Sequence, residues 1–138
     1  MTPYSPTVFD VIRNCGIWSY LCLFIGGAGV MAGLIGALLA LTKARNAAWI
    51  PGGVAVFAGL AAIAGGLLGR QMGLARLDEA LQAAAGEITP DQVERIREQG
   101  HMEANGCIPV GFVSGSGPLF LGGIAVAVGL LARKKGAS

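Results

Sequence analysis

The sequence predicts an all-α integral membrane protein with three transmembrane helices, the first two forming a tight hairpin, and a short extramembrane helical arm between the second and the third. Three apolar runs carry this prediction, 17–42, 50–69 and 107–132, and none of them contains an acidic or basic side chain. A helix needs about 20 apolar residues to cross a hydrocarbon core about 30 Å thick. Charged residues make up only 13% of the chain, whereas soluble domains carry about 25%.

The chain opens on a short segment, 1–16, whose apolar residues at 8–12 are spaced as in one or two turns of an interfacial helix. Trp18 and Tyr20 then fall where lipid headgroups would lie, the usual place for such amphipathic rings. The hydrophobic region of a signal peptide is typically only about 7–15 residues long. We therefore expect the longer run 17–42 to be a retained transmembrane helix.

Small residues recur at four-residue intervals in the first two apolar runs. They are Gly29, Gly33, Gly36, Ala37 and Ala40 in the first run, and Ala58, Ala62 and Gly66 in the second. Rows of this small-xxx-small kind let two helix backbones approach closely inside a membrane. They predict helix packing, either against the other helices of this chain or against a second protein.

The connections predict how the spans are joined. Residues 43–49 are too few to do more than turn the chain back, so the first two helices form a hairpin. Residues 70–106 contain four arginines and seven acidic residues and are expected to form an aqueous helical arm. Within it, Gly86 is expected to end the first helix. Thr89-Pro90-Asp91-Gln92 has the pattern of a capped helix start, and Gly100 is a candidate helix end.

The third apolar run, 107–132, contains a candidate helix break near its entry side, followed by the basic tail 133–138. The break comprises Gly115, Ser116, Gly117 and Pro118. Proline lacks the backbone N–H and crowds the preceding turn, so a kink or a late helix start is expected there. Freed carbonyl groups are tolerated at membrane depth only where protein or water covers them.

Charge near the span ends predicts the orientation. With three spans, the connection 43–49 and the tail 133–138 share one side, which carries basic residues and no acidic one. The other side carries all eight acidic residues, and its Arg95 and Arg97 lie far from the second span and, at positions 95 and 97, some distance before the third, which begins at 107. Basic residues close to span ends favour the cytoplasm. We expect the N-terminus outside and the C-terminus in the cytoplasm, in a bacterial inner membrane.

The three cysteines bear on the same question. Cys15 and Cys107 each precede a span that enters from the same side. On an oxidising exterior they could form a disulfide between the starts of the first and third helices. The sequence leaves open whether their Cα atoms come within the required ~4.4–6.8 Å. Cys22, inside the first span, is expected to be a small buried hydrophobe.

Catalytic patterns are absent from the sequence. His101 has only Glu98 and Glu103 nearby, too few ligands for a metal site, and no histidine stands where it could serve Ser114 or Ser116 as a base. Proton pathways in membranes are marked by ionisable groups, whereas these spans contain no acid, histidine, lysine or arginine. We expect no enzyme activity, no cofactor and no metal. The net charge of +2 gives no basic surface for nucleic acid.

The stretch 8–29, VFDVIRNCGIWSYLCLFIGGAG, resembles the beginning of the MotA/TolQ/ExbB proton-channel family. The comparable positions are Ile12, Gly16, Trp18, Tyr20 and Leu21. The resemblance implies a short interfacial helix followed by a first span running from outside to inside. The family's long cytoplasmic region and its Gly-Thr-rich channel motif have no counterpart here, since Thr42 is the only threonine near a span. No residue of the family's proton pathway is therefore carried over.

Two functions fit these features. One is a non-enzymatic inner-membrane subunit that packs or oligomerises through Gly/Ala-rich helices, in the form of an ExbB-like component of a proton-channel or energy-transducing complex. Its partners would be the lipid bilayer and either further copies of itself or another membrane protein. The alternative is a holin-like pore-forming protein, which shares three spans, the same orientation and a basic tail. The arm is longer than a lytic pore needs, which favours the subunit.

Overall fold

The architecture is a bundle of three long helices with a helical hairpin at one end. The structure is a computed structural model that describes residues 7, 13, 15–42 and 44–136, and no strand occurs among them. The elements are α2 (Ile17–Leu41), the 3-10 turn η1 (Arg45–Ala47), α3 (Trp49–Ala83), α4 (Pro90–Asn105) and α5 (Cys107–Gly136). Three of its helical segments are long and apolar enough to cross a membrane. The expected turns of interfacial helix at 8–12 lie outside the described residues.

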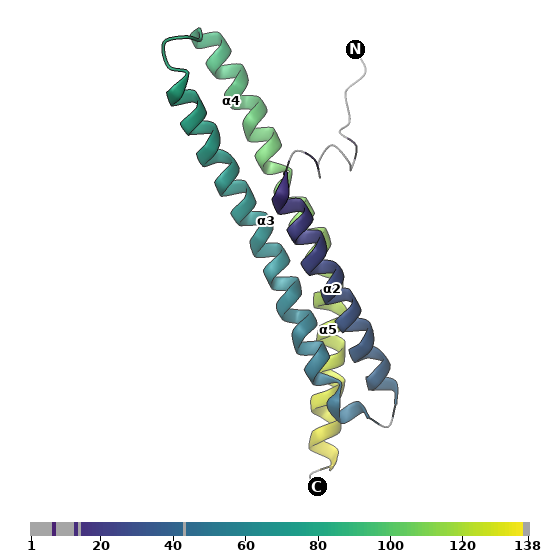
Figure 1. Ribbon diagram of the computed structural model, residues 1–138. Coiled ribbons are helices and arrows are strands. Elements are labelled where there is room, and N and C mark those ends of the chain that lie inside the picture. The colour runs from purple at the N-terminus through teal and green to yellow at the C-terminus, as the bar shows by residue number, and fades with distance from the viewer. Residues whose placement is uncertain (1–6, 8–12, 14, 43, 137–138) are drawn as a thin grey trace.

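The three long helices alternate in direction. α2 and α5 run in the same direction, and α3 runs antiparallel to both. η1 and the end of α5 therefore lie at the same end of the molecule (Figure 1). The turn between α3 and α4 lies at the far tip (Figure 1). α4 then returns along α3 and leads directly into α5, with Gly106 alone between the two helices.

The interior of the bundle is lined by small residues. In α2 they are Ser19, Cys22, Gly26, Gly29, Gly33 and Gly36, and in α3 they are Gly52, Ala55, Gly59, Ala62, Gly66 and Gly69. Their spacing alternates between three and four residues, the 3.5-residue period of helices that cross at a shallow angle. We call these residues, together with the buried α5 residues that face them, the glycine seam; the α5 members are Gly111, Gly115, Pro118, Gly122, Ala125 and Gly129. Large apolar side chains point outward instead, with Phe24 77% and Phe57 75% exposed.

The residues singled out in the sequence enter the seam only in part. Gly29, Gly33, Gly36, Ala62 and Gly66 are buried between helices of this chain.

Ala37, Ala40 and Ala58, from the same rows, are only partly buried. Four residues turn an α-helix through more than one full revolution, so a strict four-residue row drifts out of a straight contact by about 40° per step. The alternation of three and four residues keeps each helix facing its neighbours.

α3 and α5 make the closest approach, through pairs of glycines. A Cβ atom built on Gly122 would lie 2.6 Å from the carbonyl oxygen of Gly52, and one built on Gly66 would lie 2.9 Å from the Cα of Gly111. Real Cβ atoms do not come this close to backbone. The two helices therefore meet backbone to backbone, which only glycine permits.

α5 passes through Pro118 as one helix. The late helix start considered for 115–118 does not occur, because α5 already begins at Cys107. Proline cannot donate to the carbonyl group four residues earlier, that of Ser114. A Cβ built on Gly26 would lie 2.5 Å from this carbonyl oxygen. The bare backbone of α2 thus covers the carbonyl that the proline leaves free, as an apolar environment requires.

Beyond Gly69, α3 continues past the start of α2 and pairs with α4, forming the arm (residues 70–106; Figure 1). The predicted start of α4 is confirmed: Thr89 precedes it, Pro90 opens it, and the Thr89 N–H donates to Gln92 Oε1 at 2.9 Å. Gly86, at φ 107°, lies in the turn between the helices.

The prediction that Gly100 ends a helix is wrong. α4 runs on to Asn105. A Cβ at Gly100 would lie 2.5 Å from a methyl carbon of Leu77 on α3. The glycine therefore serves the close approach of the two arm helices rather than a helix end.

Candidate functional site

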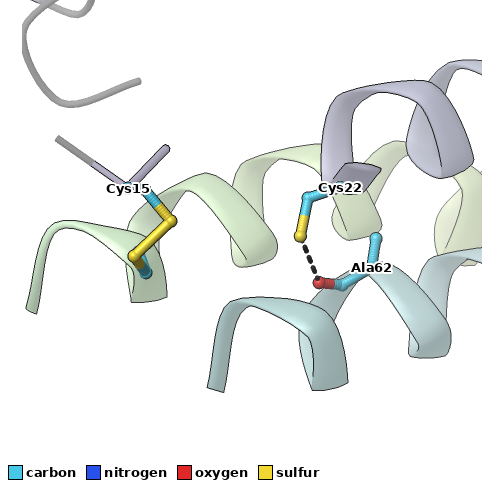
Figure 2. The surroundings of a disulfide bond; sticks show 4 residues. Cys15, Cys22 and Ala62 are labelled. Carbon is cyan, nitrogen blue, oxygen red and sulfur yellow. Dashed lines mark hydrogen bonds between the residues drawn. A yellow bond between two sulfur atoms is a disulfide. The ribbon is translucent and has the colours of Figure 1, made fainter. Parts of the chain in front are cut away.

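The base of the arm is tied by a disulfide between Cys15 and Cys107. Their Cα atoms lie 5.1 Å apart, and both residues are buried. The bond joins the chain just before α2 to the first residue of α5, across 92 positions of sequence (Figure 2). A second tie lies close by, where Arg70 Nε donates to Asn105 Oδ1 at 2.8 Å. These two links hold α2, α3, α4 and α5 together at one level.

The third cysteine takes no part in this tie. Cys22, seven residues after Cys15 and inside α2, is a free, buried thiol whose Sγ donates to the carbonyl oxygen of Ala62 on α3 at 3.4 Å (Figure 2). It packs as a small residue of the glycine seam.

A cleft of about 330 Å³ opens beside the disulfide. We call it the arm-base cleft. Its lining comes from the start of α2, from α3 as it leaves the bundle, and from the end of α4: Cys15, Gly16, Ile17, Trp18, Gly69, Met72, Gly73, Arg76, Leu77, Gly100, Glu103, Ala104 and Cys107. Its volume lies within the range of about 300–1,000 Å³ typical of small-molecule sites.

The cleft is mostly apolar, with one cation and one anion. Arg76 extends from α3 and Glu103 from α4. Glu103 accepts a hydrogen bond from Gln99 Nε2 at 3.2 Å on its own helix. Among the described residues no ion pair joins the Arg76 guanidinium to a carboxylate. The cleft therefore presents both charges to whatever enters it.

Comparison with protein-family models, with curated proteins and with solved structures found no match.

The outer surface of the arm is polar but carries exposed apolar side chains. On α4, Met102 is 71% and Ile96 42% exposed. His101 is exposed beside Met102 and Glu98. Within the described residues, no group of three or more His, Cys, Asp or Glu side chains is placed to hold a metal ion.

The opposite end of the bundle is basic. Arg133, Lys134 and Lys135 occupy the last turn of α5, and the Arg133 guanidinium lies 5.4 Å from the ring centroid of Trp49 at the start of α3. A guanidinium at this distance from an indole face makes a cation–π contact. It links α5 to α3 at the end where the chain turns through η1.

Sequence reasoning did not foresee the arm-base cleft, although it singled out Trp18, Cys15 and Cys107 for other reasons. The part of its lining that comes from α3, from Gly69 to Leu77, faces α4. How α4 folds back against α3 determines this part of the cleft. The nearest signal was Gly100, a glycine in the middle of an otherwise regular helical pattern, which marks a close approach.

Proposed function

We propose that this protein is a non-enzymatic subunit of a bacterial inner-membrane complex that presents its helical arm to a partner protein. α2, the first part of α3, and α5 would cross the bilayer. The arm would stand on the outer side and the C-terminal end in the cytoplasm. The observation that carries the proposal is the arm itself: a paired helical hairpin, fixed at its base and projecting beyond the bundle, with apolar side chains exposed.

Two independent features support this orientation. The Cys15–Cys107 disulfide lies at the arm end, and structural disulfides persist in oxidising compartments. The basic last turn of α5 lies at the opposite end, and positive charges close to span ends favour the cytoplasmic side. Both features favour the proposed orientation, with the arm outside.

A scaffold role fits the bundle better than a conduit. Its axis is occupied by direct backbone contacts along the glycine seam, such as those of Gly52 with Gly122 and Gly66 with Gly111. The glycines of the glycine seam already contact other helices of this chain, so they are not available to contact a second copy. If the resemblance to the MotA/TolQ/ExbB family reflects function, a titrating carboxylate would have to come from a partner's helix.

Site-specific photo-crosslinking in living cells tests the proposal. A photoreactive phenylalanine analogue at Met102 or Ile96, both exposed on α4, should give one discrete adduct with a partner protein. The same analogue at Phe57, exposed on the apolar face of α3, is the matched control and should react with lipid alone. Absence of any protein adduct from both arm positions would contradict a docking role.

The pore-forming alternative is tested in the same cells. A scaffold should accumulate without effect on the membrane potential, because its helices contact each other backbone to backbone along the glycine seam. Prompt loss of potential on expression, measured with a voltage-sensitive dye, would favour a holin-like pore and overturn the proposal.

A further inference from the structure

We infer that the arm-base cleft binds the headgroup of a phosphoethanolamine lipid. The inference depends on the bilayer location proposed above and adds a ligand to the protein. Four features of its described lining carry the inference: its level along the bundle, two opposite charges that form no ion pair among the described residues, an apolar wall, and Trp18 as the one aromatic ring.

The cleft lies where the apolar helices begin. Ile17 opens α2, Cys107 opens α5, and Gly69 is the last buried glycine of α3. Trp18, in the lining of the cleft, is of the residue type that concentrates at the headgroup level of membranes. With the three helices in a bilayer, the cleft opens at the depth of phosphate and ammonium groups.

The charges of the cleft complement a zwitterionic headgroup. The Arg76 guanidinium presents a fork of N–H donors that matches phosphate oxygens. The Glu103 carboxylate, on the facing helix, accepts hydrogen bonds from an ammonium group. Arg76 and Glu103 do not form an ion pair with each other. The headgroup can therefore enter without an ion pair between them having to break.

The rest of the wall suits the upper part of a lipid chain. Trp18, Met72 and Leu77 supply apolar surface to the lining of the cleft. A primary ammonium can donate hydrogen bonds to Glu103, whereas the methylated ammonium of choline cannot. Choline is bound instead by cages of aromatic rings, and the described lining of this cleft has one ring, Trp18. A phosphoglycerol headgroup would offer Glu103 neutral hydroxyl groups and no cation.

Native mass spectrometry of the purified protein, without any partner, tests the site. The probes are phosphatidylethanolamine, phosphatidylglycerol and phosphatidylcholine with identical acyl chains, together with water-soluble phosphoethanolamine. The wild type should retain phosphatidylethanolamine preferentially. Arg76→Gln and Glu103→Gln should each weaken this retention about tenfold, the effect of losing one charge-assisted hydrogen bond.

Matched controls are Arg95→Gln and Glu79→Gln, which remove the same charges from exposed arm positions outside the cleft. Retention by these variants should equal that of the wild type. An intact disulfide on a non-reducing gel reports that each variant is folded.

Each other outcome overturns the inference. Equal retention by all variants would identify nonspecific surrounding lipid. Equal binding of phosphatidylglycerol, sensitive to Arg76→Gln alone, would identify a purely anionic site. Equally strong binding of free phosphoethanolamine would identify a soluble ligand. The lipid measurement uses the purified protein without a partner. Lipid binding can therefore be observed even if crosslinking of the arm fails, and crosslinking can succeed even if no lipid is retained.

Discussion

Three pairs of adjacent glycines show how finely position decides the role of a residue. Gly26, Gly52 and Gly122 lie in the glycine seam, where an added Cβ would collide with the neighbouring helix. Their next neighbours in sequence, Gly27, Gly53 and Gly123, have open space where a Cβ would be. One step along an α-helix turns a side chain by about 100°, from the seam to the outer surface.

Replacing each member of such a pair in turn by alanine should separate the effect of helix packing on stability from the effect of helix propensity. Gly122→Ala places a methyl group against the backbone of α3 and should destabilise the bundle by about 1–3 kcal/mol, the usual cost of overpacking. The change is measured as the shift of the unfolding midpoint in detergent.

Gly123→Ala is the control for the same helix turn. It gains helix propensity worth up to about 1 kcal/mol without a collision, so its midpoint should stay level or rise. Equal destabilisation by both variants would show that the close approach of α3 and α5 is not as described.

At the scale of elements, the arm depends on how its base is held. α3 and α4 run antiparallel, and Gly100 allows α4 to approach Leu77 closely. The disulfide and the hydrogen bond from Arg70 to Asn105 then join this hairpin to the bundle. The start of α4 was predictable because capping is local, whereas its end was not, because Gly100 is explained only by a neighbour on another helix.

Removing the disulfide should loosen the base of the arm. The double variant Cys15→Ser/Cys107→Ser loses a link across 92 positions, which constrains the unfolded chain, and should lose about 2–4 kcal/mol of stability. Thermal unfolding with and without dithiothreitol measures this loss.

The wild type in dithiothreitol should unfold like the double variant in either condition. Cys22→Ser is the control for thiol chemistry, because this free cysteine lies outside the bond; its midpoint should still fall when dithiothreitol is added. A wild-type midpoint insensitive to dithiothreitol would contradict the proposed link.

At the scale of the whole molecule, charge divides the bundle into two ends. All acidic residues except Asp10 lie between 78 and 103, in the arm. The opposite end holds the connection 43–49 and the basic last turn of α5, with no acidic residue near either in the sequence. This asymmetry, together with the position of the disulfide, supports an arm on the outer side.

Cysteine labelling tests the orientation directly. The native cysteines give little background, because one is buried and the other two are bonded. Arg97→Cys, in the arm, should react with a membrane-impermeant maleimide on intact cells, whereas Lys134→Cys should react only after permeabilisation. The reverse pattern would place the arm in the cytoplasm, and labelling of both in intact cells would contradict a spanning bundle.

The amino-acid sequence alone predicts the number of long apolar helices, the hairpin of the first two and the capped start of α4. These features follow from hydrophobicity, chain length and local hydrogen bonding. The packing of the helices, in contrast, shows which glycines meet, that α5 continues through Pro118 with Gly26 covering the freed carbonyl, and that Arg76 and Glu103 share a cleft. The physical reason is that a contact between helices depends on how each is rotated and placed against its neighbours, whereas composition and spacing describe each helix alone.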